Sequence, residues 1–506
     1  MAQFDWTILQ NGSDIRGVAM NGIIGEEVTL SRERVGAIGD AFVRWLWKRC
    51  GEKSLRIAIG MDCRITSPDF MEELEYQITK LGCDVLNCGL ASTPAMFLST
   101  NNKRIGADGA IMITGSHQTF NRNGLKFFIP NADVSRADIS EILLIASIND
   151  KTQPSKEKGQ THITNLIASY AAVLREKICA DINDRDDYNH PLRGFRIIVD
   201  AGNGAGGFYA RRVLKPLGAD VSDSQFLEPD GRFPNHVPNP EDYESMHSIS
   251  TAVRYHSADL GLLFDTDVDR VAVVDSNGRE IFRNELVALA SAIVLSEHPD
   301  TTIVTDSITS EGLGYFITRK LNGRHRRFLR GYRNVINEAI RLNANDEECW
   351  LAVETSGHSA FRENHFLDDG AYLATKIVIK MAQLRREGRH LSDLISELPI
   401  AKESREYRIH ITMSDFSRVA SEVMAALRLY VAQMPNWEEV NQNYEGLRVM
   451  CNSDTEKGWF MLRLSLHEPE LPLNVESDIE GGLDNIMKRL KQFFRNISGI
   501  EYSDLQ

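Results

Sequence analysis

The stretch Gly261–Asp275 reads GLLFDTDVDRVAVVD, and its pattern decides the fold. Two apolar runs flank three aspartates on alternate residues, so we expect two buried strands joined by a short loop that carries Asp265, Asp267 and Asp269. Three carboxylates this close together repel one another unless a cation lies between them, and their hard oxygen ligands suit Mg²⁺ or Ca²⁺. The loop therefore predicts a magnesium site. Arg270, directly after it, indicates that an anion such as a phosphate binds there as well.

Two other interpretations of this acidic loop are possible. A solvated surface loop would need no cation, but the apolar strands on both sides argue against it. An EF-hand calcium loop also begins Asp-x-Asp-x-Asp, yet it needs Gly at its sixth position and Glu at its twelfth, where this chain has Arg270 and Ser276. The flanks are also strand-like, so the calcium interpretation fails.

Composition restricts the class of protein. The 506 residues are 42% hydrophobic and 25% charged, which indicates a soluble globular protein of roughly three or four domains. The formal net charge is -14 and the basic residues are dispersed, so we expect no nucleic-acid partner. No apolar run reaches the roughly 18 residues of a spanning helix, and we expect no membrane partner. Seven cysteines without a Cys-x-x-Cys pair predict reduced thiols, no zinc site and a cytoplasmic location, or an organelle if a transit peptide was removed.

Alternating strand and helix patterns predict the α/β class. The expected helices cover 31–49, 69–81, 414–433 and 481–494, and a further helix starts in the stretch 365–371 and runs to about 386. The expected strands cover 55–60, 84–86, 109–113, 195–200, 302–305, 350–353, 407–411, 459–465 and 473–476. A polar stretch over 149–160 predicts a linker. We expect three consecutive α/β/α sandwich domains with mixed, mostly parallel sheets over 1–155, 156–299 and 300–403. A smaller α+β domain follows over 404–506.

Ser116 follows the expected strand over 109–113. Catalytic residues of α/β sheets gather at such carboxyl ends, Gly115 leaves the serine hydroxyl accessible, and His117 could take its proton. Lys126 lies near the end of a further strand that is rich in phenylalanine. A plain turn serine beside a surface histidine is the alternative, and no Gly-x-Ser-x-Gly elbow favours a hydrolase triad.

Several other turns carry polar groups. Arg16 lies between two glycines, which on its own is typical of an ordinary loop. The Gly-rich turn 201–207 departs from Gly-x-Gly-x-x-Gly, so we do not expect a dinucleotide site. Glu354, Ser356 and His358 end the expected strand over 350–353, and they suit either recognition of sugar hydroxyls or a helix-capping turn. Nearer the carboxyl end, a guanidinium, a hydroxyl and an imidazole could form a phosphate clamp, from Arg463, Ser465 and His467.

Taken together, in this order, these stretches resemble the α-D-phosphohexomutase superfamily over essentially the whole chain. Its sharpest motifs are the phosphoserine loop Thr114–His117, the metal loop Asp265–Arg270 and the sugar-recognition loop Glu354–His358. The proline-rich loop Asp230–Pro240 is a further close match. Each motif alone is weak, but four in the order and spacing of the family are a specific signal.

The resemblance implies a role for each site residue. Ser116 would be the phosphorylated nucleophile, and Mg²⁺ would be held by Asp265, Asp267, Asp269 and a phosphoryl oxygen on Ser116. The transferring group would be surrounded by Arg16, His117, Lys126 and Arg270, the sugar would be held by Glu354, Ser356, His358 and Arg333, and the phosphate would be held by Arg463, Ser465 and His467. The reaction would interconvert hexose 1-phosphate and 6-phosphate of glucose or mannose through a hexose 1,6-bisphosphate, in a monomer or a homodimer.

The chain departs from the family pattern in its substrate loops. Leu466 and His467 replace Gly and Thr of the usual phosphate loop, Gln118–Thr119 replaces Asn-Pro, and Arg333 replaces a lysine. Leucine adds bulk where backbone would approach a phosphate, and arginine is a poorer proton shuttle than lysine. Phosphoglucosamine mutase is therefore an alternative. A regulatory protein that binds sugar phosphates without turnover is a second alternative. A milder version of it would transfer phosphoryl groups to water, as a phosphatase does.

Overall fold

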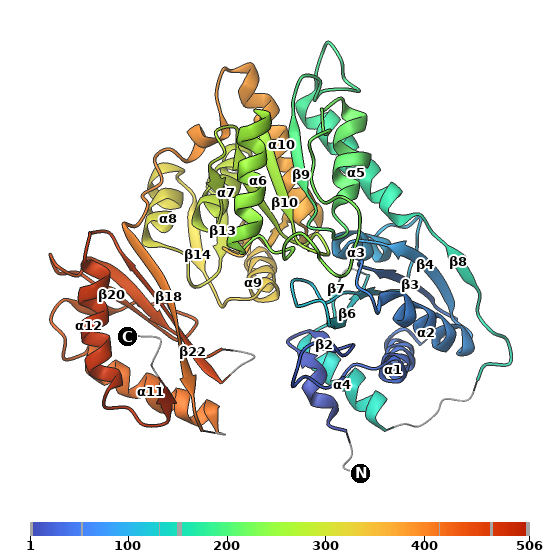
Figure 1. Cartoon of the computed structure of the whole chain (residues 1–506), viewed down its shortest axis with the longest axis horizontal. Coiled ribbons are helices and arrows are strands. Elements are labelled where there is room, and N and C mark those ends of the chain that lie inside the picture. The colour runs from blue at the N-terminus through green and yellow to red at the C-terminus, as the bar shows by residue number, and fades with distance from the viewer. Residues whose placement is uncertain are drawn as a thin grey trace. The chain divides into compact units, whose positions relative to one another are not determined.

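The computed structural model describes residues 4–51, 54–130, 132–148, 154–413, 415–465 and 469–501. The chain forms two compact units, one of Met1–Phe282 with Ser356–Ser392 and one of Arg283–Thr355 with Asp393–Gln506 (Figure 1). Among the described residues, no helix combines the length and apolar character needed to cross a membrane.

The amino-terminal sheet of the first unit carries the serine loop. Its strands, in the order β1-β2-β6-β5-β3-β4-β8 with β7 beside β6, are β1 (Gln10–Asn11), β2 (Asp14–Val18), β3 (Arg56–Met61), β4 (Asp84–Leu90), β5 (Gly109–Ile113), β6 (Arg122–Ile129), β7 (Ala132–Asp133) and β8 (Thr161–Ile163). Strand β3 pairs in parallel with β4 and β5, whereas β6 runs antiparallel to β2 and β5. The sheet is therefore mixed, with its parallel strands next to the serine loop.

Four helices cover this sheet. One face packs against α1 (Arg32–Cys50), α2 (Ser67–Lys80) and α4 (Arg136–Ser147), and α3 (Thr93–Asn101) lies on the other face (Figure 1). Helix α1 begins where the sequence predicts, because the side chain of Ser31 accepts a hydrogen bond from the backbone N–H of Arg34. Its apolar residues at helical spacing, including Phe42 and Trp45, are buried in the core.

The second sheet carries the acidic loop. Its strands, in the order β12-β11-β10-β9, are β9 (Ile197–Asp200), β10 (Leu260–Phe264), β11 (Val271–Asp275) and β12 (Glu280–Ile281). Strands β10 and β11 form the antiparallel pair expected around the three aspartates, and β9 runs parallel to β10. The helical and remaining strand segments of this part are α5 (Leu166–Ile182), the π-helix Tyr209–Leu214, α6 (Tyr243–His256), β16 (Ser359–Phe361), β17 (Leu367–Asp368) and α10 (Gly370–Arg386).

The second unit combines a parallel sheet with an antiparallel one. In the parallel sheet, β13 (Thr302–Thr305) lies between β14 (Arg324–Arg327) and β15 (Cys349–Val353). Its helices are α7 (Asn284–Glu297), α8 (Glu311–Tyr315) and α9 (Tyr332–Ala344). The antiparallel sheet, in the order β19-β20-β21-β22-β18-β23, comprises β18 (Glu403–Ile411), β19 (Trp437–Glu439), β20 (Leu447–Cys451), β21 (Gly458–Leu462), β22 (Glu470–Ser477) and β23 (Ile500–Glu501), packed on α11 (Phe416–Val431) and α12 (Gly482–Phe494).

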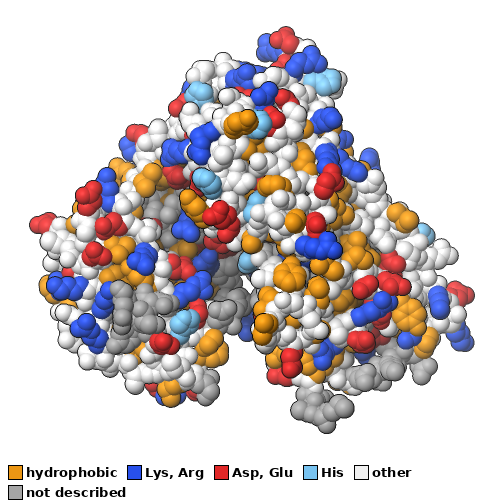
Figure 2. All heavy atoms as spheres, in the orientation of Figure 1, with side chains coloured by type: hydrophobic (Ala, Val, Ile, Leu, Met, Phe, Trp, Pro, Cys, Tyr) orange, Lys and Arg blue, Asp and Glu red, His pale blue; other side chains and the backbone are white. Residues whose placement is uncertain are grey.

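The expected fold class, α/β domains with mixed sheets followed by a smaller α+β domain, is confirmed. The domain boundaries at 155, 299 and 403 stay predictions. On the face drawn in Figure 2, Lys and Arg side chains are interspersed with Asp and Glu, as the composition indicates.

Candidate active site

The serine loop leaves the carboxyl end of β5. The backbone N–H of Ser116 donates to Thr114 Oγ1 at 2.8 Å, and Ser116 has φ 49°, in the left-handed region that residues with a side chain rarely adopt. Its side chain is nearly buried. Such a conformation persists only where the surroundings enforce it, which is typical of functional positions.

His117 adjoins the serine hydroxyl. Its Nδ1 lies 3.4 Å from Ser116 Oγ, and the residue stays exposed to solvent. The positive charge of Arg270 is the main cause that holds the pKa of His117 well below its usual range, followed by burial and the charge of Arg16. The ring keeps contact with solvent, so burial contributes less to this lowered pKa than the neighbouring positive charges do. The imidazole is therefore neutral beside the hydroxyl.

Arg16 reaches the serine loop from β2. Its Nη1 donates to Thr114 O, and its Nη2 donates to Asp14 Oδ2 at 3.0 Å. Arg16 pairs across the sheet with Gly124 of β6, where an added Cβ would lie 2.2 Å from Ile15 O and 2.6 Å from Arg16 Cδ. Glycine is needed at 124 because no other residue leaves room for the arginine.

Lys126, on the same strand β6, links the serine sheet to the acidic loop. Its Nζ lies 2.9 Å from Asp267 Oδ2 and also pairs with Asp269. Thr93, at the start of α3, donates its hydroxyl to Asp267 Oδ2 at 2.6 Å and its backbone N–H to Asp267 O at 2.9 Å. These contacts tie Asp267 and Asp269 to the strand that follows the serine loop and Asp267 to the start of α3.

The three carboxylates of the acidic loop form one buried cluster. Asp265, Asp267 and Asp269 are 0% exposed, and each offers an oxygen such that these atoms lie within 4.8 Å of one another. Burial, and then the charge of Asp269, raises the pKa of Asp265 well above its usual range. Burial also acts on Asp269, but Lys126 and the neighbouring cations outweigh it and lower the pKa of that carboxyl. The cluster is a set of hard oxygen donors held close together.

Polar atoms in this cluster lack partners. Asp267 Oδ1 and Asp269 Oδ1 are buried acceptors without a hydrogen bond from any described residue, and Arg270 Nη2 is a buried donor in the same position. Buried polar groups in native proteins are almost always satisfied, so acceptors and a donor without a hydrogen bond are suited to hold a cation and an anion. Oxygen donors of this kind fit a hard divalent metal ion.

The Gly-rich turn 201–207 supports the acidic loop. The backbone N–H of Ala205 donates to Thr266 O at 2.8 Å, and a Cβ at Gly204 would lie 2.8 Å from Thr266 Cα. On the other side, the backbone N–H of Gly370, at the start of α10, donates to Val268 O at 3.2 Å. Glycine at these positions has no side chain, which allows the neighbouring backbone segments to approach the acidic loop closely.

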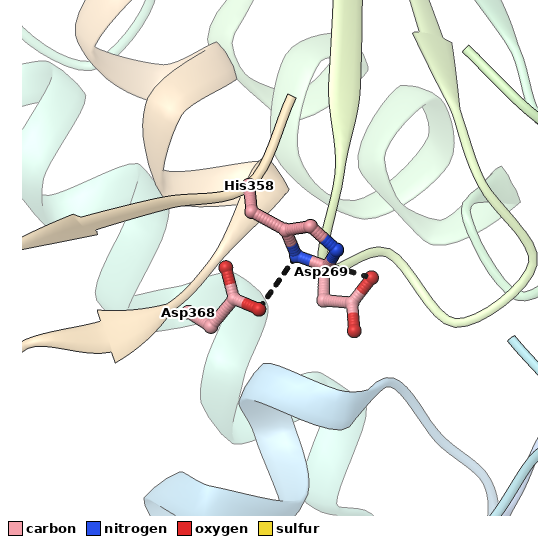
Figure 3. A group of neighbouring side chains, drawn as sticks. All are labelled: Asp269, His358 and Asp368. Carbon is pink, nitrogen blue, oxygen red and sulfur yellow. Dashed lines mark hydrogen bonds and ion pairs between the residues drawn. The ribbon is translucent and has the colours of Figure 1, made fainter. Parts of the chain in front are cut away.

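His358 faces the acidic loop from the segment that follows β15 in the chain. Figure 3 shows its ring between Asp368 and Asp269, with Nδ1 at 2.7 Å from Asp368 Oδ2 and 3.9 Å from Asp269 Oδ1. Burial favours the neutral ring, but the charges of Asp368 and Asp269 outweigh it and raise the pKa of His358 to about 9. The ring is therefore a cation whose orientation Asp368 fixes.

The predicted site residues divide between the two units. Those of the first unit are Arg16, Ser116, His117, Lys126, Asp265, Asp267, Asp269, Arg270, Ser356 and His358, and those of the second are Arg333, Glu354, Arg463 and Ser465. Glu354 Oε1 accepts the backbone N–H of Gly331 at 2.6 Å, and Arg333 Nε donates to Tyr332 Oη at 2.9 Å. His467 lies outside the described residues.

Four residues around the candidate active site were not predicted from the sequence: Asp62, Arg64, Thr93 and Asp368. Asp62 and Arg64 follow β3 as Ser116 follows β5, and these strands are parallel neighbours. The rule that directs attention to the carboxyl ends of strands could have found them. Thr93 carries no such signal, since it meets Asp267 across 174 residues, and Asp368 meets His358 across 10 residues without following an expected strand.

Comparison with known proteins gives matches along the chain. Family models for α/β/α domains I, II and III of phosphoglucomutase/phosphomannomutase match residues 8–153, 175–278 and 283–401. The chain is 29% identical over 472 residues to a phosphomannomutase/phosphoglucomutase of Pseudomonas aeruginosa, covering 91% of this chain and 93% of that one. It is 28% identical over 465 residues to a phosphoglucosamine mutase of Geobacter metallireducens, covering 88% and 96%.

The fold also matches a solved structure. The crystal structure of a phosphoglucomutase/phosphomannomutase family protein from Burkholderia thailandensis has 25% sequence identity and a TM-score of 0.78 to this chain. The match covers 97% of this chain and 98% of that one. The similarity therefore extends over the whole architecture, including the carboxyl-terminal domain.

Proposed function

We propose, since the chain belongs to the α-D-phosphohexomutase superfamily, that it interconverts hexose 1-phosphate and hexose 6-phosphate through a phosphorylated Ser116. As a hexose phosphate mutase it is an isomerase, and sugar phosphates are its substrates. Glucose and mannose phosphates are the proposed substrates, with a hexose 1,6-bisphosphate as intermediate and activator.

The observation that carries this proposal is the set of unpaired buried atoms beside the serine loop. Asp267 Oδ1 and Asp269 Oδ1 accept no hydrogen bond from the described residues and suit a metal ion, and Arg270 Nη2 suits an acceptor such as a phosphoryl oxygen. A phosphoserine carries about -1.5 to -2 charge, so a site that holds one must supply positive charge close by. Arg16, Lys126 and Arg270 supply it here.

The reaction needs two phosphoryl transfers. The phosphoryl group on Ser116 Oγ passes to O6 of the hexose 1-phosphate, which breaks the Ser116 Oγ–P bond, forms the O6–P bond and leaves the O6 proton on Ser116 Oγ. After the bisphosphate has turned round, the O1–P bond breaks, a new Ser116 Oγ–P bond forms, and the proton of Ser116 Oγ goes to O1, which leaves hexose 6-phosphate. His117 lies beside Ser116 Oγ and is proposed to exchange the proton of that hydroxyl.

The family has a metal site, and the acidic cluster of this chain fits it. We assign Mg²⁺ as the metal, held by Asp265, Asp267 and Asp269 together with the phosphoryl group of Ser116. When bound, Mg²⁺ neutralises charge on the transferring phosphoryl group. Lys126 orients the carboxylates of Asp267 and Asp269, and Arg270 binds the Asp265 carboxylate at 3.1 Å.

The resemblance to the family assigns sugar recognition to Glu354, Ser356 and His358. Ser356 Oγ is buried and has no hydrogen-bond partner among the described residues, which suits a sugar hydroxyl. Arg333 is proposed to meet the phosphate of the bound sugar. The second phosphate is assigned to Arg463 and Ser465, and Arg463 Nε is likewise buried without an acceptor among the described residues. We place the enzyme in the cytoplasm, as a monomer or a homodimer.

A ³¹P NMR time course tests the function directly. The protein is incubated with Mg²⁺, trace hexose 1,6-bisphosphate and, in separate samples, the 1-phosphates of glucose, mannose and glucosamine. We expect the 6-phosphate of glucose or mannose to appear. Conversion of glucosamine 1-phosphate alone would make the protein a phosphoglucosamine mutase, the activity that names the Geobacter relative. No conversion, with sugar phosphate still bound, would make it a non-catalytic binding protein.

A further inference from the structure

Arg64 contacts the backbone of the serine loop. It follows β3, the parallel neighbour of β5, and the two strand ends are tied together because the backbone N–H of Asp62 donates to Ile113 O at 2.9 Å. The side chain of Arg64 is 0% exposed and pairs with Asp62, whose Oδ2 accepts from Nε at 3.1 Å. A buried arginine with one carboxylate partner forms a neutral pair, so its burial does not leave an uncompensated charge.

All five N–H donors of Arg64 have an acceptor. Apart from Nε, Nη1 donates to Thr119 O and Arg122 O at 2.7 Å each, and Nη2 donates to Gln118 O at 2.7 Å and to Ser116 O. Four of the five acceptors are thus carbonyl oxygens of the segment 116–122 that contains the nucleophile. A guanidinium offers five donors in a planar fork, and no other side chain could replace all of these bonds.

Neighbouring residues fix the guanidinium in place. A Cβ at Gly115 would lie 2.5 Å from Arg64 Cζ and 2.6 Å from Nε, so the loop rests directly on the planar group. The Phe233 ring of the proline-rich loop 230–240 covers Arg64, with Cζ 5.4 Å from its centroid. Gly231 of the same loop packs on this turn, since its Cβ would lie 2.7 Å from Arg64 Cα. The proline-rich loop 230–240 therefore packs against Arg64 and covers it.

We propose that Arg64 is a positioning residue for phosphoryl transfer. By binding the carbonyl oxygens of the loop, it holds Ser116 at its left-handed backbone conformation and so places Oγ for both transfers. Arg64 does not contact the substrate in this mechanism. The inference rests on the proposed function, because it assigns a partner to the nucleophile of that reaction.

The test is the rate constant of a single phosphoryl transfer. Protein phosphorylated on Ser116 is mixed with glucose 1-phosphate, or with whichever hexose 1-phosphate the wild type converts, and quenched at intervals. A rate constant does not depend on the fraction of folded protein, so a loss of stability alone would leave it unchanged. For Arg64→Lys we expect a fall of about 10- to 100-fold, since misplacing a reacting group by about 1 Å costs about 10²-fold. Binding of the hexose phosphate should change by less than about twofold, because Arg64 lies away from the substrate.

Arg34→Lys is the matched control. Arg34 also donates to two backbone carbonyl oxygens, those of Val28 and Thr29, and also lies over a phenylalanine ring, that of Phe4 at 3.5 Å. It holds a different loop, so its variant should transfer phosphate at the wild-type rate. An equal fall in both variants would overturn the proposal, as would an unchanged rate constant for Arg64→Lys.

Gly115→Ala provides an independent test if Arg64→Lys does not fold. The added methyl group displaces the guanidinium while all charges remain, and we expect a fall in the same rate constant of about 10-fold or more. In the double variant the two effects should be less than multiplicative, because both act through the same contact. Wild-type transfer by Gly115→Ala, or multiplicative effects, would overturn the proposal. A wild type that transfers no phosphate would instead refute the proposed function.

Discussion

The first and second units carry opposite kinds of candidate site. In the first unit, the acidic cluster is rich in unpaired acceptors, Asp267 Oδ1 and Asp269 Oδ1 among them, and it is suited to a cation. In the second unit, burial and then the charge of Arg330 lower the pKa of Arg463, while Glu445, Glu406 and Asp306 act in the opposite direction. Arg463 Nε is a buried donor without an acceptor among the described residues, which suits an anion. Under the proposed function, phosphoryl transfer and phosphate recognition would therefore be carried by separate parts of the fold.

The two regions also differ in how firmly their residues are held. Ser116 and the aspartates are buried in loops that follow strands, and Lys126 is buried within β6, where it pairs with Asp267. Arg333 is only half buried, in the first turn of α9, and its Nε donates to the adjacent Tyr332. Under the proposed function, the first region carries the phosphoryl transfer and the second binds the sugar and its phosphate. Substitutions in the first region should therefore reduce the rate, and those in the second should alter substrate affinity.

The largest effect is expected for Ser116→Ala. Without the hydroxyl no phosphoserine forms, and turnover should fall by about 10⁴-fold or more. Binding of hexose phosphate, measured by calorimetry, should persist, because the residues of the second unit are intact. Ser147→Ala, at an exposed hydroxyl that bonds to Leu144 O, is the control and should keep full activity. Full mutase activity in Ser116→Ala would show that the assigned mechanism is wrong.

Asp267→Asn should have the next largest effect. The amide keeps the shape of the side chain but removes a charged oxygen ligand, so kcat should fall by about 10²-fold and more Mg²⁺ should be needed for half-maximal rate. Chelation should abolish wild-type activity, and Mg²⁺ should restore it. Asp69→Asn, at an exposed position in the first turn of α2, should change neither quantity. Unchanged metal dependence in Asp267→Asn would remove the metal assignment.

The sequence predicts much of the fold and of the first region. Strand β13 covers 302–305 as expected, and the acidic loop lies between two buried strands, because apolar runs bounded by polar turns are a local signal. Ser116 and the aspartates were found for the same reason, since each directly follows such a run. The parallel strands next to the serine loop likewise follow from the βαβ rhythm.

What the sequence could not predict depends on contacts between distant segments. Lys126 meets Asp267 across 141 residues, and Arg64 meets Ser116 across 52, so both depend on register and packing rather than on local pattern. The sequence argues against a dinucleotide site in the Gly-rich turn 201–207, but it does not predict that this turn packs against the backbone of Thr266. The division that places Glu354 in one unit and Ser356 in the other has no signal in a motif that spans only a few residues.

Arg463→Lys should affect binding rather than the rate. Lysine keeps the positive charge but cannot make two parallel bonds to a phosphate, so KM should rise about tenfold while kcat changes little. Arg428→Lys, at an exposed arginine of α11 that bonds to Glu439, is the control in the same domain. A fall in kcat with unchanged KM would place Arg463 in the chemical step and would break the proposed separation of roles.

Glu354→Gln should have the smallest effect. One carboxylate oxygen of Glu354 already accepts the backbone N–H of Gly331, and glutamine can keep that bond with its carbonyl oxygen. The loss is then one charged acceptor for a sugar hydroxyl, so KM should rise about three- to tenfold with little change in kcat. Glu397→Gln, which removes an exposed partner of Lys320, should leave both constants unchanged. If Glu354→Gln instead lowered kcat as strongly as Asp267→Asn, Glu354 would belong functionally with the chemistry of the first unit despite its place in the second.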